Sequence, residues 1–419
     1  MNVCLSRVVL AAFALAASLA AGKESDGPVL KADDVKRYVE AFNRDDNELY
    51  RGAVSNAQAW AFLEENMPLL DCPDEEIQRT YYFRWWSYRK HIKPTPEGWV
   101  VDEFLPDVPW AGKFNTISCA AGHHLYEGRW LRDPQYLRDY EAFWFGKGGD
   151  PRRYSFWAAD AVWQLACVSG DFERPKRLLP ELIANYEAWE QTHRDANGLY
   201  WQMDDRDGME CSISGGLHPK KQGYRATLNS YQYGDALAIA RIAELAGEPE
   251  VARDYRGKAA AIKKAVQERL WNADAQFFEV IPRGTEKLSD VRELHGYTPW
   301  YFNLPDPAYA VAWRLAMDPQ GFRAPYGLTT AEQRHPKFAV SYTGHECKWD
   351  GPVWPFATAV TLTGLANLLN GSPQEVIATK DYFELLRGYA RSHQIRLGDG
   401  RVVPWIDEVQ NPTNGDWIS

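Results

Sequence analysis

The sequence predicts an all-α fold in which helical hairpins form an α/α toroid. Segments with helical apolar spacing and helix end signals recur along most of the 419 residues. Alternation with a period of two is nearly absent outside short pieces such as 276–282. Some segments, such as 155–168 and 353–369, are apolar on nearly every side, which suits an inner layer of helices covered by an outer one.

The expected helices lie on both sides of an acidic, Gly-containing stretch at 198–235. Their connections are rich in Gly and Pro, which end helices and form turns. No fixed-length repeat is visible, which argues against a solenoid. The expected helices span residues 30–43, 55–66, 74–90, 115–131, 134–145, 153–168 and 175–193 before this stretch, and 228–246, 249–270, 306–317, 352–369 and 374–393 after it.

The first 21 residues have the pattern of a secretory signal peptide. Arg7 precedes the apolar run VVLAAFALAASLAA, and small residues lead to Gly22. The run is short for a membrane span, and no Cys follows it to accept a lipid anchor. We expect a signal peptide at 1–21 and one domain at 22–419, in a secreted or periplasmic protein. An uncleaved membrane anchor is the alternative.

Composition argues against several classes of partner and cofactor. The chain has 47 Lys and Arg against 57 Asp and Glu, a net charge of −10, and no basic cluster that would attract nucleic acid or an anionic membrane. The cysteines beyond residue 21 are scattered and include no CxxC, so neither a disulfide framework nor a zinc knuckle is indicated. We expect no metal and no cofactor, and the oligomeric state is left open.

Acidic and aromatic residues gather in the 198–235 stretch. A sugar presents apolar ring faces and hydroxyl groups, so its site combines aromatic surface with carboxylates, Arg and Asn. Acids are costly to bury unpaired, so these face water or a polar cleft, and the aromatics favour the cleft. A solvated acidic loop is the alternative. The acids are Asp204, Asp205, Asp207, Glu210 and Asp235, and the aromatics are Tyr200, Trp201, Tyr224, Tyr231 and Tyr233.

Two further regions carry unusual side chains. The long connection at 91–114 holds three aromatics and three acids, and loops of this length are usually functional or disordered. In the next helix, His123 and Glu127 could share a metal, but Gly128 stands where a metalloprotease pattern needs a second His. We favour the interpretation that these groups brace one another beneath a site. The aromatics of the connection are Trp99, Phe104 and Trp110, and its acids are Asp102, Glu103 and Asp107.

The C-terminal region contains a second pair of acidic and aromatic loops. Residues 345–358 place Trp349, Asp350 and Trp354 around a Gly-Pro turn. Residues 402–419 place Asp407 and Glu408 beside Trp405, before a turn-forming NPTNG. Two carboxylates on separate loops of one cleft are what glycoside hydrolysis needs, because one acid protonates the departing oxygen while a second activates water or attacks carbon.

Three motifs resemble those of trehalases and of glycoside hydrolase family 63. The segment DGMECS at 207–212 resembles their S-G-[MW]-D-x-S, KWDGPVWP at 348–355 resembles Y-W-R-G-P-x-W-P, and DEVQNPTNGDW at 407–417 is similar to the loop carrying their catalytic base. The motifs occur in the family order. Longer runs, such as WAGKFNTISCAAGHHLYEGRWL, look like the mannosylglycerate-hydrolase-like group, whose fold is a six-hairpin (α/α)6 toroid.

The resemblance implies a role for individual residues. Glu210 falls at the position of the general acid and Glu408 at that of the general base of an inverting hydrolase. The family acid is usually Asp, so Asp207 or Asp205 is an alternative to Glu210. Relatives line the sugar site at positions that correspond here to Arg225, Asn229, Tyr231, Trp349, Asp350 and Trp354, and we add the loop aromatics Trp110 and Trp405 as substrate contacts.

Two departures and two alternatives qualify this interpretation. Asp350 replaces the family Arg, which bears on the identity of the substrate. Relatives also continue past the base loop with a further helix, so we expect a truncated toroid lacking its last helix.

A non-catalytic carbohydrate-binding protein would keep the aromatics and lose the acid–base pair. A polysaccharide lyase on a toroid would use Tyr or His as base, and could recruit His123 or His124. The partner in each case is an oligosaccharide or glycoside.

Overall fold

The structure, a computed structural model, describes residues 30–340 and 347–418 and is predominantly helical. The predicted signal peptide lies outside the described residues. The α-helices are α1 (Lys36–Asp45), α2 (Asn56–Asn66), α3 (Glu75–His91), α4 (Ser118–Gly128), α5 (Gln135–Gly146), α6 (Ala158–Ser169), α7 (Glu173–His193), α8 (Ala226–Ala246), α9 (Pro249–Arg269), α10 (Thr298–Tyr301), α11 (Pro355–Gly371) and α12 (Thr379–Ser392). The 3-10 helices are η1 (Ala32–Val35), η2 (Lys113–Asn115), η3 (Asp205–Asp207), η4 (Leu294–Tyr297) and η5 (Pro307–Ala316).

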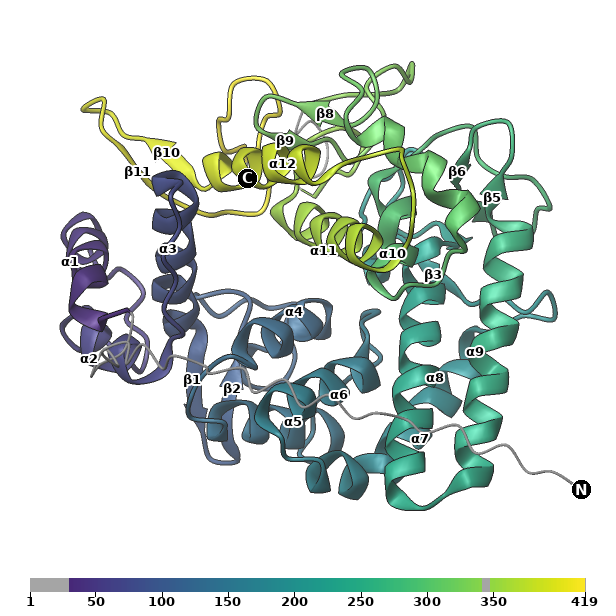
Figure 1. Ribbon diagram of the computed structural model, residues 1–419, viewed down its shortest axis with the longest axis horizontal. Coiled ribbons are helices and arrows are strands. Elements are labelled where there is room, and N and C mark those ends of the chain that lie inside the picture. Colours follow the sequence, from purple (N-terminus) through teal and green to yellow (C-terminus); the bar gives the residue numbers. More distant parts are fainter. Residues whose placement is uncertain (1–29, 341–346, 419) are drawn as a thin grey trace, which may run out of the picture.

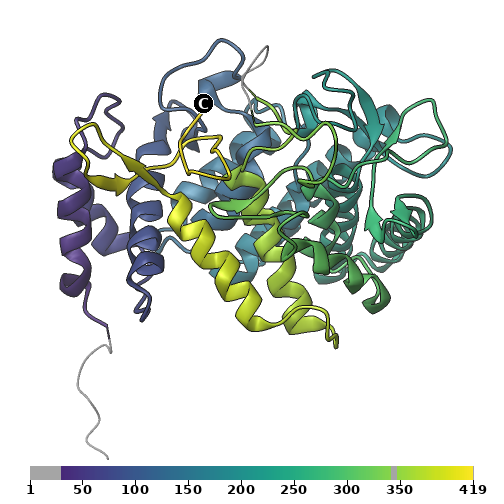
Figure 2. The ribbon, with the colours of Figure 1, turned by 90° about the horizontal axis from the view of Figure 1, so that it is seen from above.

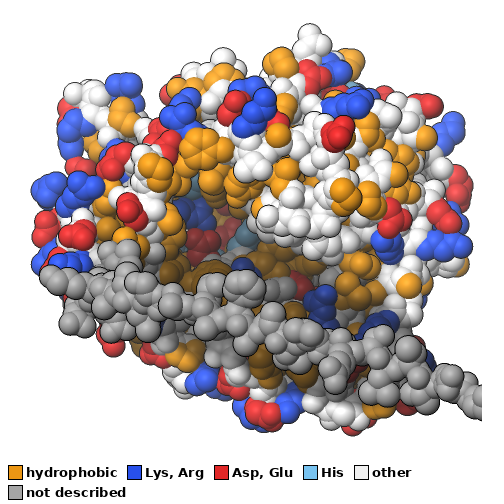
Figure 3. Space-filling view, in the orientation of Figure 1, with side chains coloured by type: hydrophobic (Ala, Val, Ile, Leu, Met, Phe, Trp, Pro, Cys, Tyr) orange, Lys and Arg blue, Asp and Glu red, His pale blue; other side chains and the backbone are white. Residues whose placement is uncertain are grey.

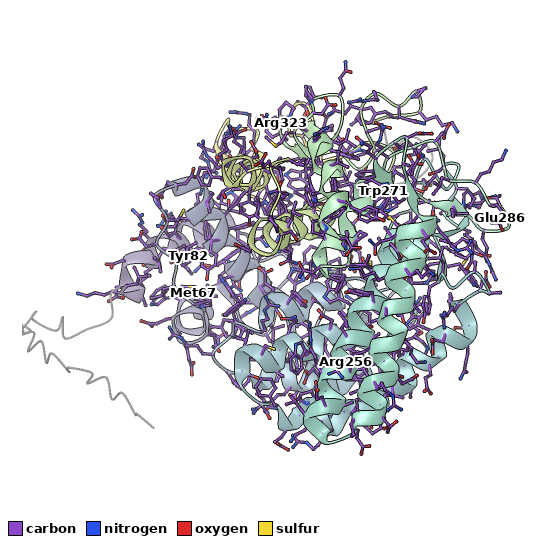
Figure 4. All side chains as sticks on the ribbon, turned by 45° about the vertical axis from the view of Figure 1, so that its right-hand side comes forward. Met67, Tyr82, Arg256, Trp271, Glu286 and Arg323 are labelled. Carbon is purple, nitrogen blue, oxygen red and sulfur yellow. The ribbon has the colours of Figure 1, made fainter. Side chains whose placement is uncertain are left out.

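The helices form a ring with an inner and an outer layer (Figure 1). Along the inner layer α4 packs against α6, α6 against α8, α8 against α10, and α10 against α11, while α12 packs against α3. Helix α8 is buried along most of its length, as expected for a helix apolar on nearly every side. Helix α9 packs against it from outside, and Figure 4 shows Arg256 on this outer helix, well away from Tyr82 of α3.

Short strands and long loops gather at one face of the ring, along the upper edge in Figure 2. All strand pairs are antiparallel, and the one three-stranded sheet of the described residues has the order β3-β4-β7. The strands are β1 (Ile92–Thr95), β2 (Gly98–Val101), β3 (Trp201–Met203), β4 (Gln222–Tyr224), β5 (Trp271–Asn272), β6 (Phe277–Phe278), β7 (Ile281–Pro282), β8 (Arg323–Ala324), β9 (Gly327–Leu328), β10 (Gln394–Arg396) and β11 (Val402–Pro404).

Local sequence signals explain where the helices around the site begin and end. The Asp74 carboxylate accepts backbone N–H bonds from Glu76 and Ile77 at 3.1 Å, which caps α3. Pro355 occupies the first position of α11, where its missing N–H costs nothing. Helix α8 ends at Gly247, whose φ of +79° suits glycine. No helix in the described part of the chain is long and apolar enough to span a membrane.

A hollow lies near the centre of the face shown in Figure 3, among α3, α4, α11 and α12, and charged side chains and a histidine are visible in it. Contacts link these helices: Arg84 Nη2 lies 3.5 Å from Glu127 Oε2, Arg84 donates to the Tyr389 hydroxyl at 3.1 Å, and the His123 and Phe356 ring centroids are 4.4 Å apart. The expected absence of a final toroid helix stays a prediction.

Candidate active site

The loop that carries Glu210 runs from β3 to β4 and is held by a buried polar network. Ser212 donates from Oγ to Asp204 at 2.9 Å and accepts the Gly215 N–H at 3.0 Å. Asp204 also forms an ion pair with Arg225, and both side chains are almost wholly buried. These bonds hold the loop at Asp204 and Ser212, on either side of Glu210.

Glu210 has the environment of a general acid. Its carbonyl accepts the backbone N–H of Trp349 at 3.1 Å, which ties the acid loop to the segment that leads into α11. Burial raises the pKa of its carboxyl to about 8, and the charges of Asp205, Glu408 and Glu103 act in the same direction. The side chain is therefore protonated at neutral pH and able to give a proton to a departing oxygen.

Glu408 lies on the loop after β11, and the same segment holds it. The Cys347 thiol donates to Glu408 Oε2 at 3.9 Å, and the Glu408 N–H donates to Asp407 Oδ1 at 2.9 Å. Two residues further along, Gln410 exchanges both backbone hydrogen bonds with Val353 at 2.9 Å. The residues from Cys347 to Val353 thus contact the loop of Glu210 on one side and the loop of Glu408 on the other.

Two more carboxyls, Glu103 and Asp207, act on the same thiol as Glu210 and Glu408. Burial raises the pKa of Cys119, near the start of α4, well above its usual value, and the charges of these four acids, here called the carboxyl cluster, act in the same direction. The turn after Asp207 packs on this cysteine, since a Cβ on Gly208 would come within 2.9 Å of Cys119 Sγ. The Thr227 hydroxyl donates to one oxygen of Asp207, and Asp207 Oδ1 is buried with no hydrogen-bond partner.

A family model of the mannosylglycerate hydrolase MGH1-like glycoside hydrolase domain matches residues 113–419. The chain belongs to this family of glycoside hydrolases. A solved protein described as a sialidase superposes with a TM-score of 0.87 at 44% identity, covering 93% of this chain and 36% of its own. The present chain therefore spans about a third of that protein.

More distant solved structures show the same fold. The mannosylglycerate hydrolase of Thermus thermophilus, in complex with glucose, has a TM-score of 0.52 at 14% identity, covering 71% of this chain and 86% of its own. Neutral trehalase of Saccharomyces cerevisiae has a TM-score of 0.50 at 13% identity, covering 61% of this chain and 62% of its own. The predicted six-hairpin (α/α)6 toroid and the predicted glycosidase family are confirmed.

The positions of Arg225 and Asn229 differ from the expectation. The resemblance predicts that they line the sugar site, but their exposed fractions are 1% and 0%. Arg225 pairs with Asp204 and donates to the Gln202 carbonyl at 2.6 Å, while Asn229 forms three backbone hydrogen bonds, two with Tyr200 and one with Arg225. Neither side chain is accessible to a substrate, and both support the loop that carries Glu210.

The predicted aromatic contacts fall into a buried and an exposed group. Trp349 and Trp354 stack with ring centroids 4.5 Å apart, and Tyr231 is packed against Trp157 at 5.1 Å. Asp350, between the two stacked rings in sequence, is also buried. Trp110 and Trp405 instead are 51% and 44% exposed, so these two are the rings of this set that solvent reaches.

His123, His124 and Glu127 were expected to brace one another, but their contacts are with residues of other elements, Glu127 being paired with Arg84 of α3. Burial lowers the pKa of His123 to about 3, and the imidazole packs between Trp157 and Phe356. Burial also holds the pKa of His124 well below its usual value, and His124 Nδ1 lies 3.0 Å from the Tyr140 hydroxyl. Among the residues that the structure describes, no group of three His, Cys, Asp or Glu side chains is placed to hold a metal.

Three site residues were not selected from the sequence: Glu103, Cys119 and Tyr154. The long connection was singled out for its acids and aromatics, but nothing in the pattern distinguishes Glu103 from Asp102 or Asp107. Burial raises the pKa of Tyr154 to about 12, while the charge of Arg206 acts in the opposite direction. The Arg206 guanidinium lies over the same ring at 4.9 Å.

Proposed function

We propose that the chain hydrolyses a glycosidic bond with inversion at the anomeric carbon, with Glu210 as general acid and Glu408 as general base. One observation carries this proposal: a single segment, Cys347 to Val353, contacts both Glu210 and the loop of Glu408. The raised pKa of Glu210 supports its role as acid, since an acid must hold a proton at the working pH. The exported location predicted from residues 1–21 is part of the proposal.

The proposed reaction needs only these two carboxyls and a water molecule. Glu210 transfers its proton to the glycosidic oxygen while Glu408 removes a proton from the water that attacks the opposite face of the sugar. The leaving group departs as an alcohol and the product sugar has the inverted configuration. We expect the two carboxyl groups to lie roughly 6.5–9.5 Å apart, because the water must fit between them. A separation near roughly 5 Å would indicate a retaining mechanism.

The sugar is best found by screening. The name of the 44% identical relative places sialosides in the panel, and the names of the two distant structures add mannosylglycerate and trehalose. Released monosaccharide identifies a hydrolase, whereas an unsaturated product that absorbs in the ultraviolet identifies a lyase. Proton NMR of the first product formed, read before mutarotation, distinguishes inversion from retention.

Variants test the two roles separately. Glu210→Gln should reduce turnover roughly 10²–10⁴-fold on natural substrates and less on substrates with a good leaving group, which need no protonation. Glu408→Gln should reduce turnover of both kinds alike. Glu286→Gln, on an exposed loop at the outer edge in Figure 4, is the matched control and should be fully active. Full activity of Glu210→Gln would transfer the acid role to Asp207 or Asp205.

A further inference from the structure

Basic side chains gather on the loop that carries Glu210. Arg206 lies shortly before Glu210, and Lys220 and Lys221 lie where the same loop returns to β4. The two parts of the loop are joined, because the Asp204 N–H donates to the Lys221 carbonyl at 3.1 Å. Lys220 and Lys221 are exposed, and Arg206 is partly exposed. The fold therefore brings together cations that the sequence separates.

Two further cations come from segments that contact this loop. Lys348 directly precedes the N–H that donates to the Glu210 carbonyl at 3.1 Å. Arg153 lies two residues before the N–H that donates to the Arg206 carbonyl at 2.8 Å, and its Nη2 donates to the carbonyl of the exposed Trp110 at 2.5 Å. We call this set the basic edge; its members are Arg153, Arg206, Lys220, Lys221 and Lys348.

The basic edge is nearly free of ion pairs, although the protein has a net charge of −10. Arg206 approaches Asp205 only at 3.9 Å. Among the described residues, no carboxylate oxygen lies within 4.0 Å of a side-chain nitrogen of the other four members. Glu210 does not neutralise them either, because its pKa of about 8 keeps it protonated at neutral pH. Cations left unpaired beside an active site attract anions from solution.

Two members of the basic edge also lie against aromatic rings. The Arg206 guanidinium lies 4.9 Å from the Tyr154 ring centroid, and Tyr154 is itself held by its N–H, which donates to Ser118 Oγ at 2.9 Å. A guanidinium restrained over an aromatic ring can still hold two oxygens of one anion. Trp110, bonded to Arg153, offers a surface on which a sugar ring can stack. Together these groups provide what an acidic sugar requires.

We propose that the basic edge binds an acidic glycan, and that the part of the substrate on the leaving-group side of the cleaved bond carries carboxylate or sulfate groups. This inference rests on the proposed function of Glu210. A general acid contacts the oxygen of the departing group, so the cations on its loop lie nearest to that group. Cations that come from three segments suit a chain with repeated charges better than one small anion. Because these side chains are accessible to solvent, salt should weaken the attraction.

Binding can be measured with glycans that differ only in charge. Polygalacturonate carries a carboxylate on each sugar, and its methyl ester has the same backbone without the charges. In affinity electrophoresis the protein should bind polygalacturonate about 10-fold more tightly than the ester at low salt, and about 500 mM NaCl should remove most of the difference. κ-Carrageenan, which carries sulfate and no carboxylate, shows whether the edge accepts both anions or carboxylate alone, and either result supports the proposal. No preference for either charged glycan over the ester overturns it.

Substitutions test whether the basic edge is responsible. The triple variant Arg206→Gln/Lys220→Gln/Lys221→Gln should bind the charged glycans about 10-fold more weakly and the ester unchanged.

The matched control changes the net charge equally on the exposed side of α9, the outer helix that carries Arg256 in Figure 4: Arg253→Gln/Arg256→Gln/Lys264→Gln. It should bind all the glycans as the wild-type protein does. Equal losses in the two triple variants would show an effect of overall charge and overturn the proposal. Single-stranded DNA bound as tightly as the charged glycans would overturn the assignment to a glycan.

These measurements do not depend on catalysis, so they separate this inference from the proposed function. A preference for charged glycans that the basic-edge variant loses supports the inference even if no glycan is hydrolysed. Hydrolysis of neutral glycans without any preference for charge would overturn the inference and leave the roles of Glu210 and Glu408 intact.

Discussion

Val353 and Gln410 exchange both backbone hydrogen bonds at 2.9 Å, and this pair joins the loop of the proposed base to the segment that holds the proposed acid. Gln410 adds two bonds from its side chain, to the carbonyls of Ser392 at 3.0 Å and Gly415 at 2.8 Å. Catalytic loops from distant parts of the chain thus share one support, and their relative position depends on it.

Removing the Gln410 side chain should therefore impair turnover more than binding. Gln410→Ala loses both side-chain bonds, and the base loop should shift enough to reduce kcat by about 10- to 100-fold with little change in KM. Asn414→Ala, an exposed change in the same loop, is the control. Steady-state kinetics decide, and a rise in KM at constant kcat would contradict the expectation.

The pKa values of Glu210 and Glu103 predict how stability depends on pH. Both carboxyls have a folded-state pKa of about 8, above their value in an unfolded chain, so the folded protein binds more protons between roughly pH 4.5 and 8. Their contribution to stability is complete below about pH 4.5 and is lost as pH rises through about 8. Glu210→Gln should accordingly melt about 1–3 °C above wild type at pH 8 and at the same temperature at pH 4.5. Calorimetry at the two pH values tests this, and a difference independent of pH would contradict it.

Arg225 should prove structural when it is replaced. Arg225→Met leaves the buried Asp204 carboxylate unpaired, which should lower the free energy of unfolding by roughly 3–5 kcal/mol. Adding Asp204→Asn should recover part of that loss. Urea unfolding measures both, and a normal stability with a raised KM would return Arg225 to the sugar site.

The exposed rings of Trp110 and Trp405 should affect binding instead. Replacing either with Ala removes a surface on which a sugar ring can stack, and KM should rise several-fold while the free energy of unfolding stays within about 0.5 kcal/mol of wild type. Kinetics and urea unfolding of the same preparations check the two expectations together. Unchanged KM in both variants would place the substrate elsewhere.

Export predicts a defined N-terminus. Ser18 and Ala20 occupy the −3 and −1 positions of a small-residue cleavage site, so the exported protein should begin near Ala21 or Gly22. N-terminal sequencing of secreted or periplasmic material measures this directly. Protein that starts at Met1 and stays in the cytoplasm would contradict it.

Helical periodicity predicted the toroid because most of its helices are long and amphipathic or wholly apolar. The segment 294–301 was missed, since η4 and α10 are short and contain Gly296 and Pro299, which sequence rules treat as breakers. The segment predicted at 306–317 is present as the 3-10 helix η5. Apolar spacing alone does not distinguish such a helix from an α-helix.

The sequence predicted individual site residues only where a recognisable motif contained them. Glu210 and Glu408 stand in recognisable segments, but the burial of Glu103 follows from long-range packing that no motif reveals. Arg225 shows the converse: Arg beside acids suggests a ligand contact, yet the structure pairs it with Asp204. Sequence spacing does not reveal which charges satisfy each other.

Cys119 shows what the carboxyl cluster does to a thiol. Burial raises its pKa well above the usual value, and the charges of Glu103, Glu210, Asp207 and Glu408 act in the same direction. Oxidants, alkylating agents and soft metals react with the thiolate, which such an environment suppresses. A thiol in this environment is slow to react with oxidants, and under the proposed mechanism the same acids that serve hydrolysis would also make the active site resistant to oxidative inactivation.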